Sequence, residues 1–98
     1  MGAEIPIKKT DKPGTPPPAD SLGFGQVFTD HMFLMDYHDG KGWHNPRIEP
    51  YGPFTLDPST IMFHYGQATF EGLKAFHAGD RIQLFRPQAN IDRMNKSN

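Results

Sequence analysis

The stretch from Val27 to Tyr37, VFTDHMFLMDY, decides the fold. It is rich in aromatic and large apolar residues and contains no glycine or proline, which favours a β-strand. Asp39-Gly40-Lys41-Gly42 follows, and this composition predicts a tight turn. The segment from Trp43 to Glu49 is then expected to return as the second strand of a hairpin. Pro46 places that strand toward a sheet edge, because proline has no N–H to donate.

The segments after this hairpin predict short helices and a second hairpin. Asp57-Pro58 is typical of a helix start, and a helical turn is expected through Phe63. Residues 67–74 have apolar side chains at helical spacing and predict another short helix. Ala78-Gly79-Asp80 separates two strand-like runs, and Pro87 opens a last helix. The order of elements predicts the α+β class, a small antiparallel sheet of hairpins with short helices packed on one face.

Residues 1–21 differ in composition from the rest. They contain five of the ten prolines and few large aliphatic residues, so we expect a flexible proline-rich arm. Its three consecutive prolines favour an extended spacer, or a strap along a partner surface, over a ligand for an SH3-like groove. The folded domain is expected over residues 22–98. Its last helix runs to Asn98 without a glycine cap, so we expect the domain to be truncated there.

Composition limits the classes of function. A chain of 98 residues fits one small domain. A net charge of -1 leaves no basic surface for nucleic acid, and a mean hydropathy of -0.64 without a long apolar run predicts no membrane span. The chain has no cysteine, which fits a reducing compartment, and its first residues lack a signal-peptide core. We therefore expect a cytoplasmic protein.

The residue types alone indicate no complete catalytic centre. The five histidines form no His-x-x-x-His or Glu-x-x-His pair, so no metal site is expected. There is neither a Gly-x-Ser-x-Gly motif nor a cysteine nucleophile. Arg93 and Lys96 on the last helix form either an anion site or a solvated face. The glycines and aromatic rings of residues 64–66 and 70–72 suit a pocket wall, although packing explains them equally well.

Five blocks of sequence, in order, resemble a known enzyme family. They are FTDHM at 28–32, PRIEPY at 46–51, FHYGQ at 63–67, FEGLKAF at 70–76, and LFRP at 84–87 with DRM at 92–94. Over about residues 22–98 they resemble the amino-terminal part of a branched-chain amino acid aminotransferase. The first and fourth blocks favour this subfamily over two relatives of the same fold type IV class, D-amino acid aminotransferase and aminodeoxychorismate lyase.

The resemblance implies the small amino-terminal domain of a pyridoxal phosphate enzyme that works as a homodimer. Such enzymes transfer the amino group of Leu, Ile or Val to 2-oxoglutarate. In the family, the lysine that binds the cofactor covalently lies in the larger carboxy-terminal domain, and Lys74 matches a different position. The resemblance therefore implies no catalytic residue in these 98 residues, and the fragment alone is expected to be inactive.

The resemblance also implies binding residues. Arg93 matches the arginine that contacts the cofactor phosphate. Tyr65 and Phe70 match side chains that line the pocket for the branched substrate, with Tyr65 reaching into the site of the neighbouring subunit. Gly72 matches a glycine beside that wall, and Phe24 is a further lining candidate. The alternatives are another fold type IV enzyme, or a noncatalytic interaction module whose proline arm and aromatic surface bind a partner.

Overall fold

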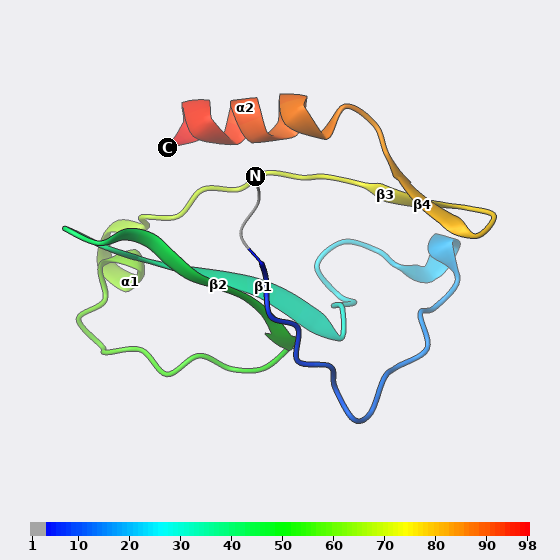
Figure 1. Ribbon diagram of the computed structural model, residues 1–98, viewed down its shortest axis with the longest axis horizontal. Helices are drawn as coiled ribbons and strands as arrows, with labels where there is room; N and C mark the ends of the chain where they lie inside the picture. Colours follow the sequence, from blue (N-terminus) through cyan, green and yellow to red (C-terminus); the bar gives the residue numbers. More distant parts are fainter. Residues whose placement is uncertain (1–3) are drawn as a thin grey trace. The chain divides into compact units, whose positions relative to one another are not determined.

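The computed structural model describes residues 4–98 (Figure 1). The chain divides into two compact units. The first unit ends at Phe54 and the second begins at Thr55. Each unit is built around one antiparallel hairpin, so the strands form two separate two-stranded sheets. With one α-helix of five residues and one of eleven, this confirms the predicted α+β class. No helix within residues 4–98 is long and apolar enough to cross a membrane.

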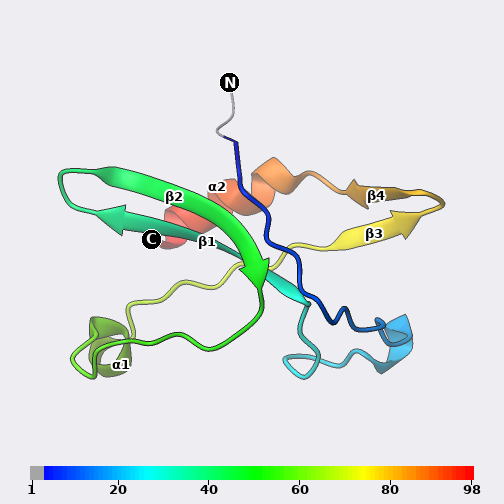
Figure 2. The same cartoon turned by 60° about the horizontal axis from the view of Figure 1, so that its bottom comes forward.

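The hairpin of the first unit pairs β1 (His31–His38) with β2 (Gly42–Pro50) (Figure 2). Gly42 adopts a positive φ of 76° at the turn, which suits glycine. The predicted start of the first strand at Val27 is wrong, since β1 begins at His31. The register explains this difference, because His31 lies opposite Pro50, the last residue of β2. Residues 27–29 have no partner strand to pair with.

Part of the proline-rich arm lies along β2. Ile7 forms an isolated parallel bridge with Ile48. The N–H of Ile48 donates to the carbonyl of Pro6 at 3.0 Å, and the N–H of Lys8 donates to the carbonyl of Ile48 at 2.9 Å. The outer edge of β2 is therefore partly covered by residues 6–8. The domain boundary expected at residue 21 stays a prediction.

The second unit begins with a turn that precedes α1 (Ile61–Tyr65). The predicted helix start at Asp57-Pro58 is wrong by three residues, since the first helical residue is Ile61 rather than Pro58. The side chain of Asp57 accepts hydrogen bonds from the N–H of Ser59 at 2.8 Å and from its hydroxyl at 2.6 Å. The Ser59 hydroxyl and N–H together lower the pKa of Asp57. Asp57 thus caps a turn ahead of the helix rather than the helix itself.

The short helix predicted for residues 67–74 is absent, since residues 66–74 contain no helix or strand. Gly66 ends α1 in a left-handed conformation with a φ of 60°, as is common just after a helix. Only eight residues then remain before β3 (Ala75–Ala78). A segment this short does not form a helix without tertiary packing on its apolar face, so it runs extended.

The predicted second hairpin and last helix are confirmed. β3 pairs with β4 (Arg81–Leu84) around a turn that includes Gly79 at a φ of 65°. The helix α2 (Pro87–Ser97) carries proline in its first turn, where the missing N–H is not needed. The residue before it, Arg86, has a φ of 48°.

No residue between 4 and 98 is buried. Large apolar and aromatic side chains on both units face solvent, among them Trp43 in the first unit and Phe85 in the second, which are 67% and 75% exposed. Exposed apolar surface of this extent is typical of a face that another polypeptide surface covers.

Candidate functional site

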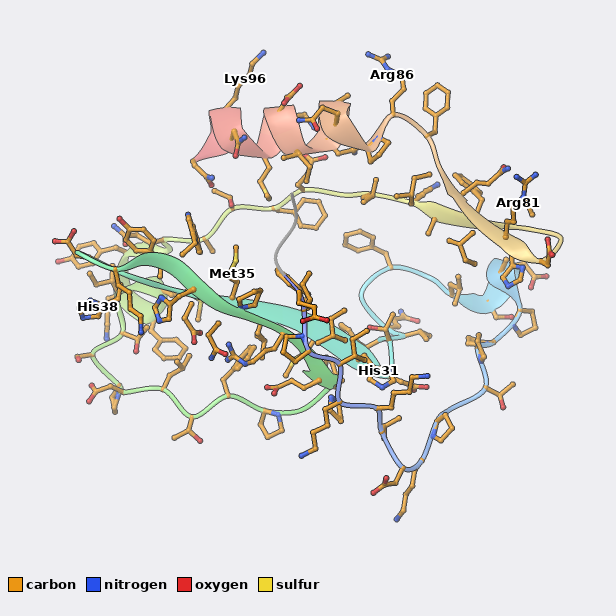
Figure 3. The ribbon with its side chains drawn as sticks, viewed as in Figure 1. His31, Met35, His38, Arg81, Arg86 and Lys96 are labelled. Carbon is orange, nitrogen blue, oxygen red and sulfur yellow. The ribbon has the colours of Figure 1, made fainter. Side chains whose placement is uncertain are left out.

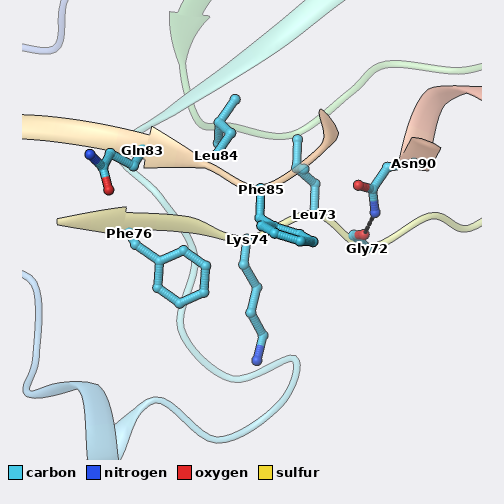
Figure 4. A pocket seen from close by; sticks show the side chains of 8 residues that line it. All are labelled: Gly72, Leu73, Lys74, Phe76, Gln83, Leu84, Phe85 and Asn90. Carbon is cyan, nitrogen blue, oxygen red and sulfur yellow. Dashed lines mark hydrogen bonds between the residues drawn. The ribbon is translucent and has the colours of Figure 1, made fainter. Parts of the chain in front are cut away.

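A cluster of three polar side chains ties α2 to the segment before β3. Arg93 donates its Nε–H to Glu71 Oε1 at 2.7 Å, and its Nη2 group donates to Glu71 Oε2. Asn90 donates from Nδ2 to Glu71 Oε2 at 3.1 Å and to the carbonyl of Gly72 at 2.6 Å. Asn90 and Arg93 lie three residues apart, so they share one face of the helix. Figure 4 shows the bond from Asn90 to Gly72.

The ion pair fixes the charge state of both partners. The hydrogen bond from Arg93 is the main cause that lowers the pKa of Glu71 to about 2, and Asn90 also contributes. Glu71 in turn raises the pKa of Arg93. The Glu71 side chain is only 8% exposed, whereas that of Arg93 is 67% exposed. The carboxylate is therefore ionised at neutral pH and set inward, while the guanidinium stays accessible.

The accessible part of Arg93 fits an anion. A guanidinium carries five N–H donors, and Glu71 engages donors on Nε and Nη2. Within residues 4–98 no hydrogen bond or ion pair involves Nη1. The remaining donors form a planar, permanently charged edge of the kind that binds phosphate oxygens.

Arg47 in the first unit is a contrasting arginine. Its Nη1 group donates to Asp36 at 3.2 Å and to the carbonyl of Asn45 at 2.9 Å, and its Nε lies 3.8 Å from Glu49. Hydrogen bonds from Asn45 and Arg47 lower the pKa of Asp36, with Asn45 the larger cause. Two carboxylates therefore surround Arg47, which makes it a poor anion site compared with Arg93.

The structure brings some of the predicted site residues together. Phe70 and Gly72 flank Glu71, so they lie directly beside the carboxylate that holds Arg93. Tyr65 ends α1 and is 82% exposed. Among residues 4–98, Tyr65 makes no hydrogen bond to Arg93. Thr69, which lies between Tyr65 and Phe70 in the sequence, donates to the side chain of Asn98 at 3.1 Å.

Phe24 belongs to the first unit, whereas the four other candidates belong to the second. It lies between Gly23 and Gly25, whose φ angles are 62° and 70°, and it is 86% exposed. The assignment of Phe24 to the substrate pocket stays a prediction.

An open groove of about 710 Å³ adjoins the Arg93 cluster within the second unit. A Cβ added at Gly72 would meet no atom within 4 Å, so local packing does not require glycine there. Figure 4 shows the groove, which has Gly72 and Asn90 at one end and the apolar side chains of Leu73, Phe76, Leu84 and Phe85 along it.

Sequence reasoning missed Glu71 and Asn90 as partners of Arg93. The spacing of Asn90 and Arg93 along the last helix was a usable signal, since it places both on one helix face. Nothing in the sequence pattern indicated that this face meets residues 71–72. Lys96, which sequence reasoning grouped with Arg93, projects away from the rest of the second unit in the view of Figure 3.

The histidines are accounted for by hydrogen bonds to the backbone. His31 accepts from the N–H of Thr10 at 3.0 Å, and the ring of His64 bonds to the carbonyl of Pro58 at 2.8 Å. His38, His44 and His77 each bond to a nearby carbonyl. In the part of the chain that the structure describes, no three His, Asp or Glu residues gather as metal ligands would.

Sequence comparison identifies similar proteins. No family model matches the chain. It is 65% identical over 82 residues to branched-chain-amino-acid transaminase 1 of Bacillus subtilis (strain 168), which covers 83% of this chain and 23% of that protein. It is 50% identical over 95 residues to branched-chain-amino-acid aminotransferase 2 of the same organism, covering 96% of this chain and 26% of that protein.

A eukaryotic relative matches over a similar span. The mitochondrial branched-chain-amino-acid aminotransferase of Saccharomyces cerevisiae (strain ATCC 204508 / S288c) is 45% identical over 96 residues, covering 97% of this chain and 24% of that protein. The chain thus spans about a quarter of the length of the curated relatives it matches. Identity at this level over nearly all of its residues places the chain in the branched-chain amino acid aminotransferase family.

Proposed function

We propose that this chain is the amino-terminal small domain of a pyridoxal phosphate-dependent aminotransferase. The whole enzyme transfers the amino group of Leu, Ile or Val to 2-oxoglutarate, and residues 22–98 form the small domain behind the arm of residues 1–21. The observation that carries the proposal is the 65% identity to a transaminase named for branched-chain amino acids. We expect the 98 residues alone to be inactive, because in the family the lysine that binds the cofactor lies in the larger domain.

Arg93 holds the phosphate of the cofactor. Its accessible, permanently charged Nη1 edge supports this role, because the donor set suits a phosphate dianion. When bound, pyridoxal phosphate supplies the electron sink for chemistry at the substrate Cα. The contribution of this chain is to anchor and orient the cofactor rather than to transfer the proton.

Tyr65 and Phe70 form the apolar wall for the branched side chain, and Phe24 is a further lining candidate. Tyr65, Phe70 and Phe24 are 82%, 76% and 86% exposed, which leaves apolar surface for a substrate and a neighbouring protein surface to cover. Such a wall favours aliphatic substrates, because a charged side chain would lose hydration there without a partner. Gly72 leaves the space beside the wall open, which its uncrowded Cβ position supports.

The exposed apolar surface supports further protein contacts in the whole enzyme. We propose that the larger domain and a second copy cover these faces and exclude water from the site, with Tyr65 entering the neighbouring subunit's site. We further propose that this homodimer acts in branched-chain amino-acid biosynthesis in the cytoplasm. The absence of cysteine from the chain is compatible with that reducing compartment.

Substrate profiling of the complete protein tests the proposal. The purified enzyme is incubated with 2-oxoglutarate and each of L-leucine, L-isoleucine and L-valine, and glutamate formation is measured. D-alanine and aminodeoxychorismate serve as the substrates of the alternative fold type IV enzymes, and pyruvate formation is measured for both, because transamination of D-alanine and cleavage of aminodeoxychorismate each release it. Preference for the branched L-amino acids supports the proposal. Turnover confined to either control substrate refutes it in favour of a relative, and a colourless, inert protein refutes it in favour of the interaction module.

A further inference from the structure

We propose that Glu71, itself held by Asn90, is a positioning residue that holds the guanidinium of Arg93 by its Nε and Nη2 edge and leaves the Nη1 edge to the cofactor phosphate. This inference rests on the proposed function, since it takes Arg93 to be the phosphate ligand. The inference gives a role to the carboxylate of Glu71, whose negative charge alone would disfavour a phosphate bound beside it.

The geometry of the ion pair is side-on. Arg93 uses Nε, at 2.7 Å from Oε1, together with Nη2 toward Oε2, so both carboxylate oxygens of Glu71 are engaged. Two parallel hydrogen bonds fix the plane of a guanidinium as well as its position. A single-point contact would leave Arg93 free to rotate. The side-on contact therefore determines which edge remains for another ligand.

The carboxylate of Glu71 is itself held in place. Asn90 donates to Oε2 at 3.1 Å and, through the same amide nitrogen, to the carbonyl of Gly72 at 2.6 Å. The side chain of Glu71 is only 8% exposed, which limits its movement. Asn90 thus links the helix that carries Arg93 to the backbone beside Glu71, and the three residues form one connected network.

An Arg93 side chain that is fixed in place before the cofactor arrives favours binding of the cofactor phosphate. A long side chain loses rotamer freedom when it closes on a ligand, and a side chain that is already fixed loses less. Glu71 keeps the guanidinium in one orientation while it remains 67% exposed. The negative charge of Glu71 opposes an incoming phosphate, but it is compensated by the same guanidinium.

A competing role for Glu71 predicts the opposite sign. If the carboxylate occupied the place of the phosphate, its removal would strengthen cofactor binding. The structure favours positioning, because Glu71 engages the Nε edge and leaves Nη1 without a partner among residues 4–98. Binding measurements on Glu71→Gln therefore distinguish the two roles by direction as well as by size.

The experiment measures cofactor affinity in the complete protein. We strip the cofactor from three variants, Glu71→Gln, Asn90→Leu and Lys96→Ala. Each variant is then titrated with pyridoxal phosphate and, separately, with pyridoxal, which lacks the phosphate. Binding is followed by absorbance. For Glu71→Gln we expect about tenfold weaker binding of pyridoxal phosphate, the scale of one charged hydrogen bond. Pyridoxal binding should change by less than about twofold, and Lys96→Ala should change neither.

Several outcomes overturn the inference. Equal or tighter binding of pyridoxal phosphate by Glu71→Gln supports competition instead, and an equal loss for both compounds indicates a purely structural role. Asn90→Leu removes the second donor to Glu71 together with the hydrogen bond to the Gly72 carbonyl. It should weaken binding of pyridoxal phosphate about threefold, less than the loss of one full charged hydrogen bond. If Glu71→Gln does not fold, Asn90→Leu decides the question. An unchanged ratio of pyridoxal phosphate affinity to pyridoxal affinity in Asn90→Leu refutes the proposed role of the network. If Arg93→Ala also leaves selectivity unchanged, the proposed phosphate ligand itself fails.

Discussion

Replacing Phe70 with alanine should reduce the use of leucine while leaving the cofactor bound. Phe70 is 76% exposed, so roughly 150 Å² of its surface is left for other groups to cover. A leucine side chain that covers about a third of this area gains about 1.2 kcal/mol at about 25 cal/mol per Å². Loss of that contact corresponds to about an eightfold decrease in kcat/KM for leucine.

The assay compares substrates of different length within each variant of the complete enzyme. The kcat/KM ratio of L-leucine to L-2-aminobutyrate reports contact with the distal part of the pocket, because the shorter side chain reaches it less. Phe54→Ala is the matched control, since Phe54 is also exposed, at 62%, and lies outside the proposed site. The ratio should fall in Phe70→Ala and stay unchanged in Phe54→Ala.

Two results would refute the reasoning for Phe70. An unchanged leucine ratio would show that the ring does not contact the substrate side chain. Simultaneous loss of bound pyridoxal phosphate would show that Phe70 supports the fold around Arg93 rather than the substrate. Cofactor content is therefore measured by absorbance in the same samples.

Three further predictions follow from the described contacts. Arg93→Ala should weaken retention of pyridoxal phosphate about 10- to 100-fold, the scale of one charged hydrogen bond, whereas Lys96→Ala should not change it. Equilibrium dialysis measures retention in both variants. Equal retention in Arg93→Ala and Lys96→Ala would remove Arg93 from the site. The pKa of Glu71 is lowered from 4.5 to about 2, so the stability that its ionised carboxylate gives to the folded protein should be fully present above about pH 4.5 and be lost as the pH falls through about 2. The difference in unfolding midpoint between the unaltered protein and Glu71→Gln, measured from pH 6 to pH 2, should therefore shrink across that window. A difference independent of pH would contradict this. Deleting residues 1–10 should accelerate amide exchange at Ile48, whose N–H donates to Pro6; unchanged exchange would show that this bridge does not persist in solution.

The hairpins were the most predictable part of the fold. Glycine-containing turns at residues 39–42 and 78–80 stand between runs of strand formers, and local backbone preferences suffice to place them. The start of β1 was not predictable in the same way, because it depends on the register that brings His31 opposite Pro50. Pairing across the hairpin is a nonlocal property that a single stretch of sequence does not encode.

The helices were predicted only where the signal was local. Pro87 fixed the start of α2 because its own geometry suits the first helical turn. Asp57 offered the same signal but caps a turn instead, since Ser59 supplies two nearer donors to its carboxylate. The helical spacing in residues 67–74 was misleading, because a short periodic segment becomes helical only when its apolar face is packed.

In the candidate site, too, only the residue that belongs to a local motif was predictable from the sequence. Arg93 was identified from a motif, whereas Glu71 and Asn90 emerged only when the face of α2 was placed against residues 71–72. Contacts between segments about twenty residues apart are set by packing, which the sequence pattern does not show. The proposed roles of Tyr65 and Phe24 in the substrate pocket stay predictions.

A chimera tests the central claim most directly. The 82 matched residues of branched-chain-amino-acid transaminase 1 of Bacillus subtilis are replaced by the corresponding residues of this chain, and bound pyridoxal phosphate and leucine transamination are measured. If this chain supplies the small-domain half of the site, the chimera will retain the cofactor and form glutamate from leucine and 2-oxoglutarate. A folded chimera that neither retains the cofactor nor transaminates leucine would contradict the account.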